Sequence, residues 1–137
     1  MLFNPEESID LHGFTATFVQ YVHARIKSVL RREGAGSGGA LTSLLEAPLL
    51  PLEKELLVAL EQFPSVLSSA GAEHDPSLVA GYAFRLGQIF NSFYAAHSIG
   101  SAESPSKRLL RLLIAQMTGN VLAFAMGLLG ISVPERM

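Results

Sequence analysis

Apolar side chains in this sequence recur at intervals of three or four residues, and no segment of useful length alternates apolar with polar residues. Within residues 15–33 the recurring apolar positions are Val19, Val22, Ile26, Val29 and Leu30. This spacing predicts a helix with one buried stripe. The same periodicity returns further along the chain, so we expect an all-α fold, a bundle of four to five helices.

Proline and glycine indicate where the elements begin and end. Pro51 occupies a favoured first-turn position of a helix expected over residues 51–70, which Pro64 should kink or split. Two later helices should open at Asp75-Pro76 and Ser104-Pro105, where a capping side chain precedes a proline. The last helix should stop near Gly130.

At 137 residues the chain is expected to be a single domain. Its expected parts are a helix at 15–33, a flexible Gly/Ser loop at 34–43, a helical bundle at 51–130 and a C-terminal tail at 131–137. Hydrophobic residues make up 49% and charged residues 16%, which excludes a disordered chain. The longest apolar run, 121–133, is shorter than the ~20 residues that span a bilayer, so no transmembrane helix is expected.

A second strip on the first helix carries aromatic and basic residues. At roughly 100° per residue, it contains Phe14, Phe18, Tyr21, Arg25 and Arg32. One interpretation is that the aromatic rings widen the core face and the arginines solvate its edge. The other is a surface on which nucleic-acid bases stack while arginines contact phosphates.

The net charge of −2 argues against a nucleic-acid partner at first sight. However, seven of the ten basic residues lie in two short segments: Arg25, Lys27, Arg31 and Arg32, then Lys107, Arg108 and Arg111. A near-neutral chain could therefore still present a basic strip, although a solvated helix face is the ordinary meaning of each cluster. The four histidines are scattered, there is no cysteine, and no catalytic motif is visible, so neither a metal site nor an active site is expected.

Three stretches resemble one known family. Residues 13–31, GFTATFVQYVHARIKSVLR, residues 86–94, LGQIFNSFY, and the ending GLLGISVPERM occur in the order and spacing typical of arginyl-tRNA synthetases. The resemblance is to their C-terminal DALR anticodon-binding domain, which is all-α. It covers nearly the whole chain, apart from the Gly-rich loop and residues 98–106.

The resemblance implies that the chain binds the anticodon stem-loop of tRNA(Arg) and selects cytosine as the middle anticodon base. Carried over by position, the contacts would be made by Phe18, Tyr21, Arg25, Arg31, Phe84, Tyr94 and Met137. Arg31 would contact the RNA backbone. Phe18 replaces a tyrosine common in the family, so a ring for stacking is kept and a hydroxyl contact is lost.

The resemblance also implies an upstream catalytic domain as a partner, with neither a membrane nor DNA as a further one. The family's ATP-binding signatures do not occur here, so we expect a fragment that is inactive alone and holds no cofactor. The parent enzyme would use ATP with Mg²⁺ in the cytoplasm. Two alternatives are the DALR domain of another synthetase and a helical module that docks onto another protein.

Overall fold

The computed structural model describes residues 14–33, 48–99 and 101–134, and these residues form helices with no strand among them. The helices are α2 (Phe14–Glu33), α3 (Pro51–Glu61), α4 (Phe63–Glu73), α5 (Ser77–Ala96) and α6 (Pro105–Leu128). This confirms the all-α prediction. The predicted loop at 34–43 and the last three residues of the tail lie outside the described residues.

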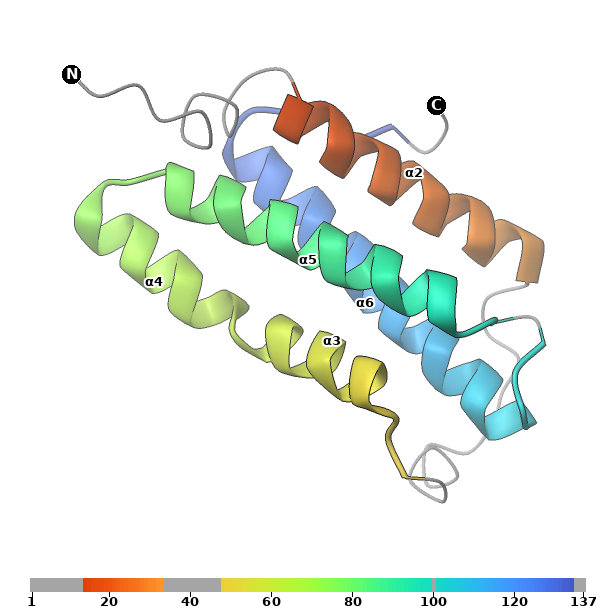
Figure 1. Cartoon of the computed structure of the whole chain (residues 1–137). Helices are drawn as coiled ribbons and strands as arrows, with labels where there is room; N and C mark the ends of the chain where they lie inside the picture. The colour runs from red at the N-terminus through yellow and green to blue at the C-terminus, as the bar shows by residue number, and fades with distance from the viewer. Residues whose placement is uncertain (1–13, 34–47, 100, 135–137) are drawn as a thin grey trace.

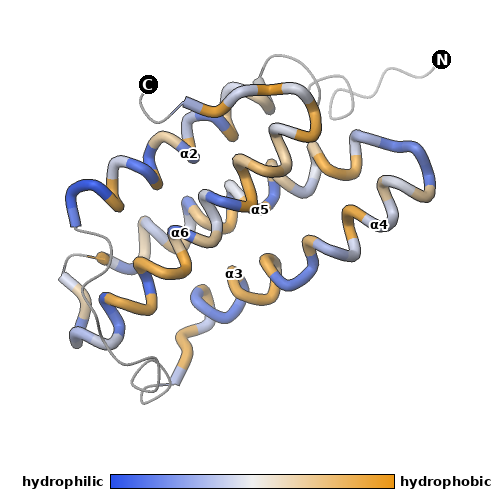
Figure 2. The backbone as a smooth tube through the Cα atoms, turned by 180° about the vertical axis from the view of Figure 1, so that it is seen from behind, coloured by the Kyte–Doolittle hydropathy of each residue, from blue (hydrophilic) through white to orange (hydrophobic). Residues whose placement is uncertain are grey.

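Helix α5 lies in the middle of the bundle, with α2 on one side and the α3–α4 pair on the other (Figure 1). Helix α6 packs against α2, α3 and α5, and in this view it lies behind α5. Apolar and polar residues alternate along the helices (Figure 2), as expected where each helix turns one face inward.

The core forms where α2, α5 and α6 meet. Val19, Val22 and Ile26 of the predicted stripe are fully buried, and Phe90 and Leu122 supply the facing surfaces of α5 and α6. A glycine at position 119 lets α6 approach closely, because a Cβ atom there would lie 3.0 Å from the Ile26 methyl group.

The predicted helix over 51–70 is split in two at Gln62. Pro64 lies in the first turn of α4. Because proline has no backbone N–H, it cannot continue the hydrogen-bond ladder of α3. The chain turns at Gln62, whose backbone N–H donates to the carbonyl groups of Val58 and Ala59.

The remaining helix ends follow the predicted signals with one shift. The Ser104 hydroxyl accepts from the Lys107 N–H at 3.2 Å and caps α6. Gly130 ends this segment with a positive φ of 76°, as a C-terminal glycine does. Asp75 is not the N-cap of α5, which begins at Ser77; its carboxylate instead accepts from the Ser77 backbone N–H.

By length and composition alone, α6 could cross a membrane. However, 56% of its most apolar stretch is buried inside the fold, and its first two turns carry the buried cations Lys107 and Arg111. A core helix of a helical bundle can be as apolar as a membrane-spanning helix. Packing of α6 against α2, α3 and α5 therefore accounts for its apolar composition.

Candidate nucleic-acid interface

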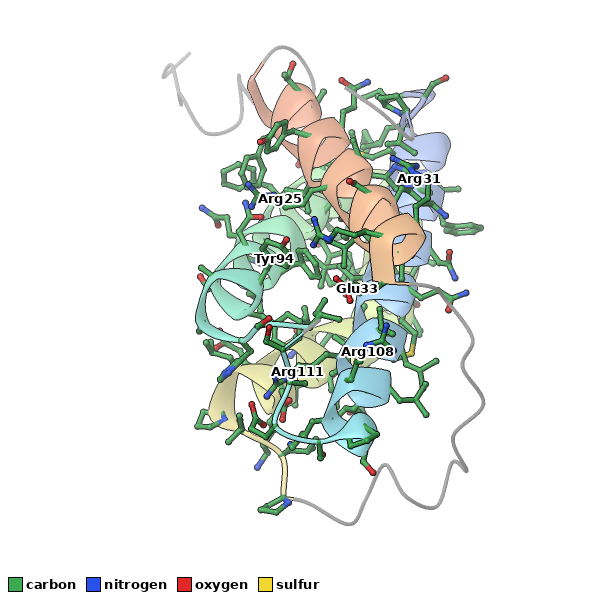
Figure 3. All side chains as sticks on the ribbon, turned by 90° about the vertical axis from the view of Figure 1, so that its right-hand side faces the viewer. Arg25, Arg31, Glu33, Tyr94, Arg108 and Arg111 are labelled. Atoms are coloured by element: carbon green, nitrogen blue, oxygen red, sulfur yellow. The ribbon has the colours of Figure 1, made fainter. Side chains whose placement is uncertain are left out.

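One guanidinium group lies close to two tyrosine rings where α2 packs on α5. The central carbon of the Arg25 guanidinium is 5.4 Å from the ring centroid of Tyr21 and 5.4 Å from that of Tyr94. Both distances fall within the range of a cation–π contact. Arg25 also donates to the Asn91 side-chain oxygen at 3.2 Å. Arg25 and Tyr94 lie on the same side of α2 in Figure 3.

Helical spacing explains how these four residues converge. Tyr21 and Arg25 are four residues apart on α2, and Asn91 and Tyr94 are three apart on α5. Residues at these intervals lie on one face of a helix. Because α2 and α5 pack against each other, the two faces meet. We call Tyr21, Arg25, Asn91 and Tyr94 the tyrosine–arginine cluster.

Both rings of this cluster are accessible, and one is fixed in place. Tyr21 is 51% exposed, and Tyr94 is half-buried. The Tyr94 ring stacks on Phe90, with centroids 6.0 Å apart, and its hydroxyl accepts from Arg32 at 3.2 Å. That hydrogen bond, followed by the one to Glu33, raises the pKa of Arg32 above its ordinary value.

Phe18 and Phe84 form a neighbouring aromatic pair. Their ring centroids are 5.0 Å apart with the planes tilted by 56°, and both residues are half-buried. Phe18 also packs closely on α5, since a Cβ atom added at Gly87 would lie 3.1 Å from its ring. These two rings therefore pack α2 against α5, and only part of their surface is exposed to solvent.

The other predicted contacts are not gathered in this place. Arg31 is exposed and extends from the other side of α2 (Figure 3). Met137 and the side chain of Phe14 lie outside the described part of the chain. Of the seven predicted site residues, the structure brings Tyr21, Arg25 and Tyr94 into one cluster, with Phe18 and Phe84 as a second pair between the same helices.

The prediction of a basic strip at the start of α6 is wrong for two of its three residues. Lys107 and Arg111 are buried, and both contact the fully buried carboxylate of Glu53. The Lys107 Nζ lies 2.7 Å from Oε1 and the Arg111 Nε lies 3.0 Å from Oε2 of this carboxylate. Sequence clustering gave no sign of this, because Glu53 belongs to α3, more than fifty residues earlier.

Glu53 is held ionised inside the fold. Burial alone would raise its pKa, but hydrogen bonds from Lys107, from the Leu50 backbone N–H and from Arg111 outweigh burial and lower it. Arg111 also donates to the Ser98 carbonyl oxygen at 2.8 Å and to the Glu103 carboxylate. One guanidinium group therefore ties α6 both to α3 and to the α5–α6 loop.

The third residue of that strip, Arg108, is half-buried at the C-terminal end of α2. It donates to the carbonyl oxygen of Glu33 and lies 3.6 Å from the Glu33 carboxylate. A cation at a helix C-terminus is favoured by the helix dipole and by the unpaired carbonyl groups there.

The C-terminal tail lies along α2 through two polar side chains that the sequence did not single out. Gln20 donates to the Ser132 carbonyl oxygen at 2.8 Å, and His23 donates to that of Pro134 at 2.9 Å. Asn91 was not predicted either, because its position three residues before Tyr94 is the only feature of the sequence that points to it. Arg32 had a signal, because it falls on the same helical strip as Tyr21 and Arg25.

The cluster offers stacking surfaces and positive charge rather than the groups of an active site. Among residues 14–33, 48–99 and 101–134, no three His, Asp or Glu side chains come together as metal ligands. The exposed Tyr21 ring and the half-buried Tyr94 ring beside a guanidinium group match the chemistry of a surface that binds unpaired bases.

Comparison with known proteins identifies the family. Residues 19–137 match the DALR anticodon binding domain. The arginine–tRNA ligases of Flavobacterium psychrophilum and Phocaeicola vulgatus are 41% and 43% identical to this chain over its whole length. The chain spans 22% and 23% of those two proteins.

The fold agrees with a solved relative. The arginyl-tRNA synthetase of Thermus thermophilus superposes with a TM-score of 0.75 at 35% identity, over 88% of this chain and 21% of that one. The chain therefore belongs to the DALR anticodon-binding domain family, in the form that occurs in arginine–tRNA ligases.

Proposed function

We propose that this chain binds the anticodon loop of an arginine tRNA as the anticodon-binding domain of an arginine–tRNA ligase. The observation that carries the proposal is the position of the Arg25 guanidinium, 5.4 Å from each of the Tyr21 and Tyr94 rings. Anticodon bases are unpaired, so they can leave the stack, lie on aromatic rings and be read on their Watson–Crick edges.

Each predicted residue has a role in this proposal. Tyr21 and Tyr94 stack on bases, and Arg25 contacts a base edge or phosphate between them. Phe18 and Phe84 extend the apolar surface beside the two tyrosines. Arg31 contacts the RNA backbone, and Met137 contacts the anticodon loop. Each base–aromatic stack contributes about 1–3 kcal/mol. The middle anticodon base selected is cytosine.

The low net charge agrees with this mode of binding. Two of the ten basic side chains, Lys107 and Arg111, are buried in ion pairs. The proposal therefore relies on the cations of α2. A protein that reads unpaired bases by stacking needs fewer phosphate contacts than one that follows a duplex.

The parent enzyme, in this proposal, attaches arginine to its tRNA in the cytoplasm with ATP and Mg²⁺. That chemistry belongs to a catalytic domain outside this chain, which we propose as its second partner. In this proposal the role of the chain is to bind the tRNA, and the catalytic groups and the ATP site lie in that other domain. By holding the anticodon, the chain places the acceptor end of the tRNA where the reaction occurs.

The proposal is tested by measuring the affinity of the chain for an anticodon stem-loop of tRNA(Arg) and for one altered at the middle base. Tyr94→Ala and a deletion of Met137 should each weaken binding of the cognate RNA or reduce the difference in affinity between the two RNAs. If neither variant does so, the assigned site is wrong.

A salt titration separates RNA binding from docking onto another protein, the alternative function. Release of counterions from RNA makes affinity fall as salt rises, whereas apolar docking does not weaken with salt in this way. We expect the affinity for the stem-loop to fall between 50 and 200 mM salt, conditions over which such losses are marked.

A further inference from the structure

A hollow of about 300 Å³ lies beside Tyr94, at the end of the bundle where α2 and α5 finish and α6 begins. Arg32 and Glu33 line it from α2, Tyr94 lines it from α5, and Ser98, Ile99 and Ser101 line it from the α5–α6 loop. Tyr94, Glu33 and the first turns of α6 lie around this region in Figure 3.

We infer that this hollow is a second nucleotide subsite, which takes an unpaired nucleobase of the same RNA loop and holds its phosphate on Arg32. The inference rests on the proposed function and extends it to residues outside the tyrosine–arginine cluster. Tyr94 belongs to both places, so a base on the cluster and its neighbour in the hollow would both lie next to this residue.

The lining has the mixed chemistry that a nucleobase requires. The partly exposed Tyr94 ring provides apolar surface, and the serine hydroxyl groups can donate to or accept from a base edge. The volume of the hollow, about 300 Å³, lies at the lower end of the range for small-ligand pockets, roughly 300–1,000 Å³.

The charge around the hollow favours a phosphate. Two cations, Arg32 and Arg108, face one carboxylate, Glu33, through contacts of 3.2 and 3.6 Å. The surplus charge is therefore positive, and it lies on Arg32, whose side chain is 60% exposed. Arg32 also bonds the Tyr94 hydroxyl, so it stands between the cluster and the hollow.

A buried charge fixes the wall of the hollow. Arg111 holds the Ser98 carbonyl oxygen at 2.8 Å and is itself paired with Glu53. The Ser98 hydroxyl in turn accepts from the Ser101 N–H at 3.0 Å. A binding site is more precise when its walls are held before the ligand arrives, so Arg111 acts here as a positioning residue.

The test combines a variant that fills the hollow with RNAs that each lack one base. Ser101→Phe should lower the affinity of the chain for the stem-loop about 5-fold or more, as expected for the loss of one base contact. Ser68→Phe, at an exposed serine of α4, is the matched control and should leave the affinity unchanged. Circular dichroism checks that both variants keep the helical fold.

A series of stem-loops with one abasic loop position each then locates the base. At one position, the abasic substitution should lower the affinity for the original chain. The same substitution should cause no further loss of affinity for the Ser101→Phe variant, because both changes remove the same contact. If Ser101→Phe binds every RNA as Ser68→Phe does, the subsite is refuted, and the proposed function stands provided that Tyr21→Ala still weakens binding. If Tyr21→Ala also has no effect, both are refuted.

Discussion

The Nε atom of Arg111 lies 3.0 Å from Oε2 of Glu53, and the side chains are 1% and 0% exposed. The two residues come from α6 and α3, and Lys107 approaches the same carboxylate at 2.7 Å. Ionised groups are costly to bury without partners. Loss of any one of the three side chains is therefore expected to leave an uncompensated charge at this end of the bundle.

Removal of one partner should show that cost. Arg111→Ala is expected to lower the free energy of unfolding by about 3–5 kcal/mol, because it leaves the Glu53 carboxylate buried with one cation fewer. Urea denaturation measures the change. Arg85→Ala, at an exposed position of α5, is the control and should fall within about 0.5 kcal/mol of the original chain. Equal effects of the two variants would show that the buried pair does not hold the fold.

Glu53 should also make the stability depend on acid pH. Its pKa is lower in the folded chain than the reference value of 4.5. Its contribution is therefore fully present above about pH 4.5 and is lost as the pH falls through the folded-state pKa. Measured by denaturation at several pH values, the stability gap between the original chain and Glu53→Gln should shrink below pH 4.5. A gap that stays constant contradicts the assignment.

Tyr82 should have the corresponding effect at alkaline pH. Burial raises its pKa from 10.0 to about 12, and its hydroxyl donates to the Ala59 carbonyl oxygen at 2.7 Å. Its contribution is present below pH 10 and is lost as the pH rises toward 12. Tyr82→Phe should cost about 1 kcal/mol at neutral pH, and this difference should narrow above pH 10. No narrowing would mean that Tyr82 ionises equally well in the folded chain.

Close packing of α6 on α2 predicts opposite effects for two glycine substitutions. Gly119→Ala places a Cβ atom 3.0 Å from the buried Ile26 methyl group and should destabilise the fold by about 1–3 kcal/mol. Gly81→Ala, inside α5, meets nothing within 4 Å and should stabilise it by about 0.5–1 kcal/mol. Thermal melts of the two variants should shift in opposite directions; a shift in the same direction contradicts the packing.

Helical periodicity was enough to predict the elements because burial and helix ends leave local signals. Val19, Val22 and Ile26 repeat at the helical interval and are fully buried, and Pro64 splits the 51–70 segment as proline chemistry requires. The start of α5 differs from the prediction by one residue, because Pro76 and not Asp75 is the N-cap, although the Asp75 side chain still accepts from the Ser77 backbone N–H.

The site could be predicted only in part, because half of it depends on contacts between helices. Tyr21 and Arg25 share one helix face and could be paired by angle alone, but their approach to Tyr94 required the packing of α2 on α5. Burial of Lys107 and Arg111 was not predictable from their own segment, because the carboxylate that makes burial tolerable lies on α3.

The central claim, that the face containing Tyr21 binds unpaired bases, is tested most directly by comparing Tyr21→Ala with Phe124→Ala. The two aromatic residues are 51% and 56% exposed, on α2 and α6 respectively. The measurement is the affinity of each variant for the anticodon stem-loop. Tyr21→Ala should lose about 1–3 kcal/mol of binding free energy, and Phe124→Ala should bind as the original chain does. Equal affinities for the two variants would contradict the account.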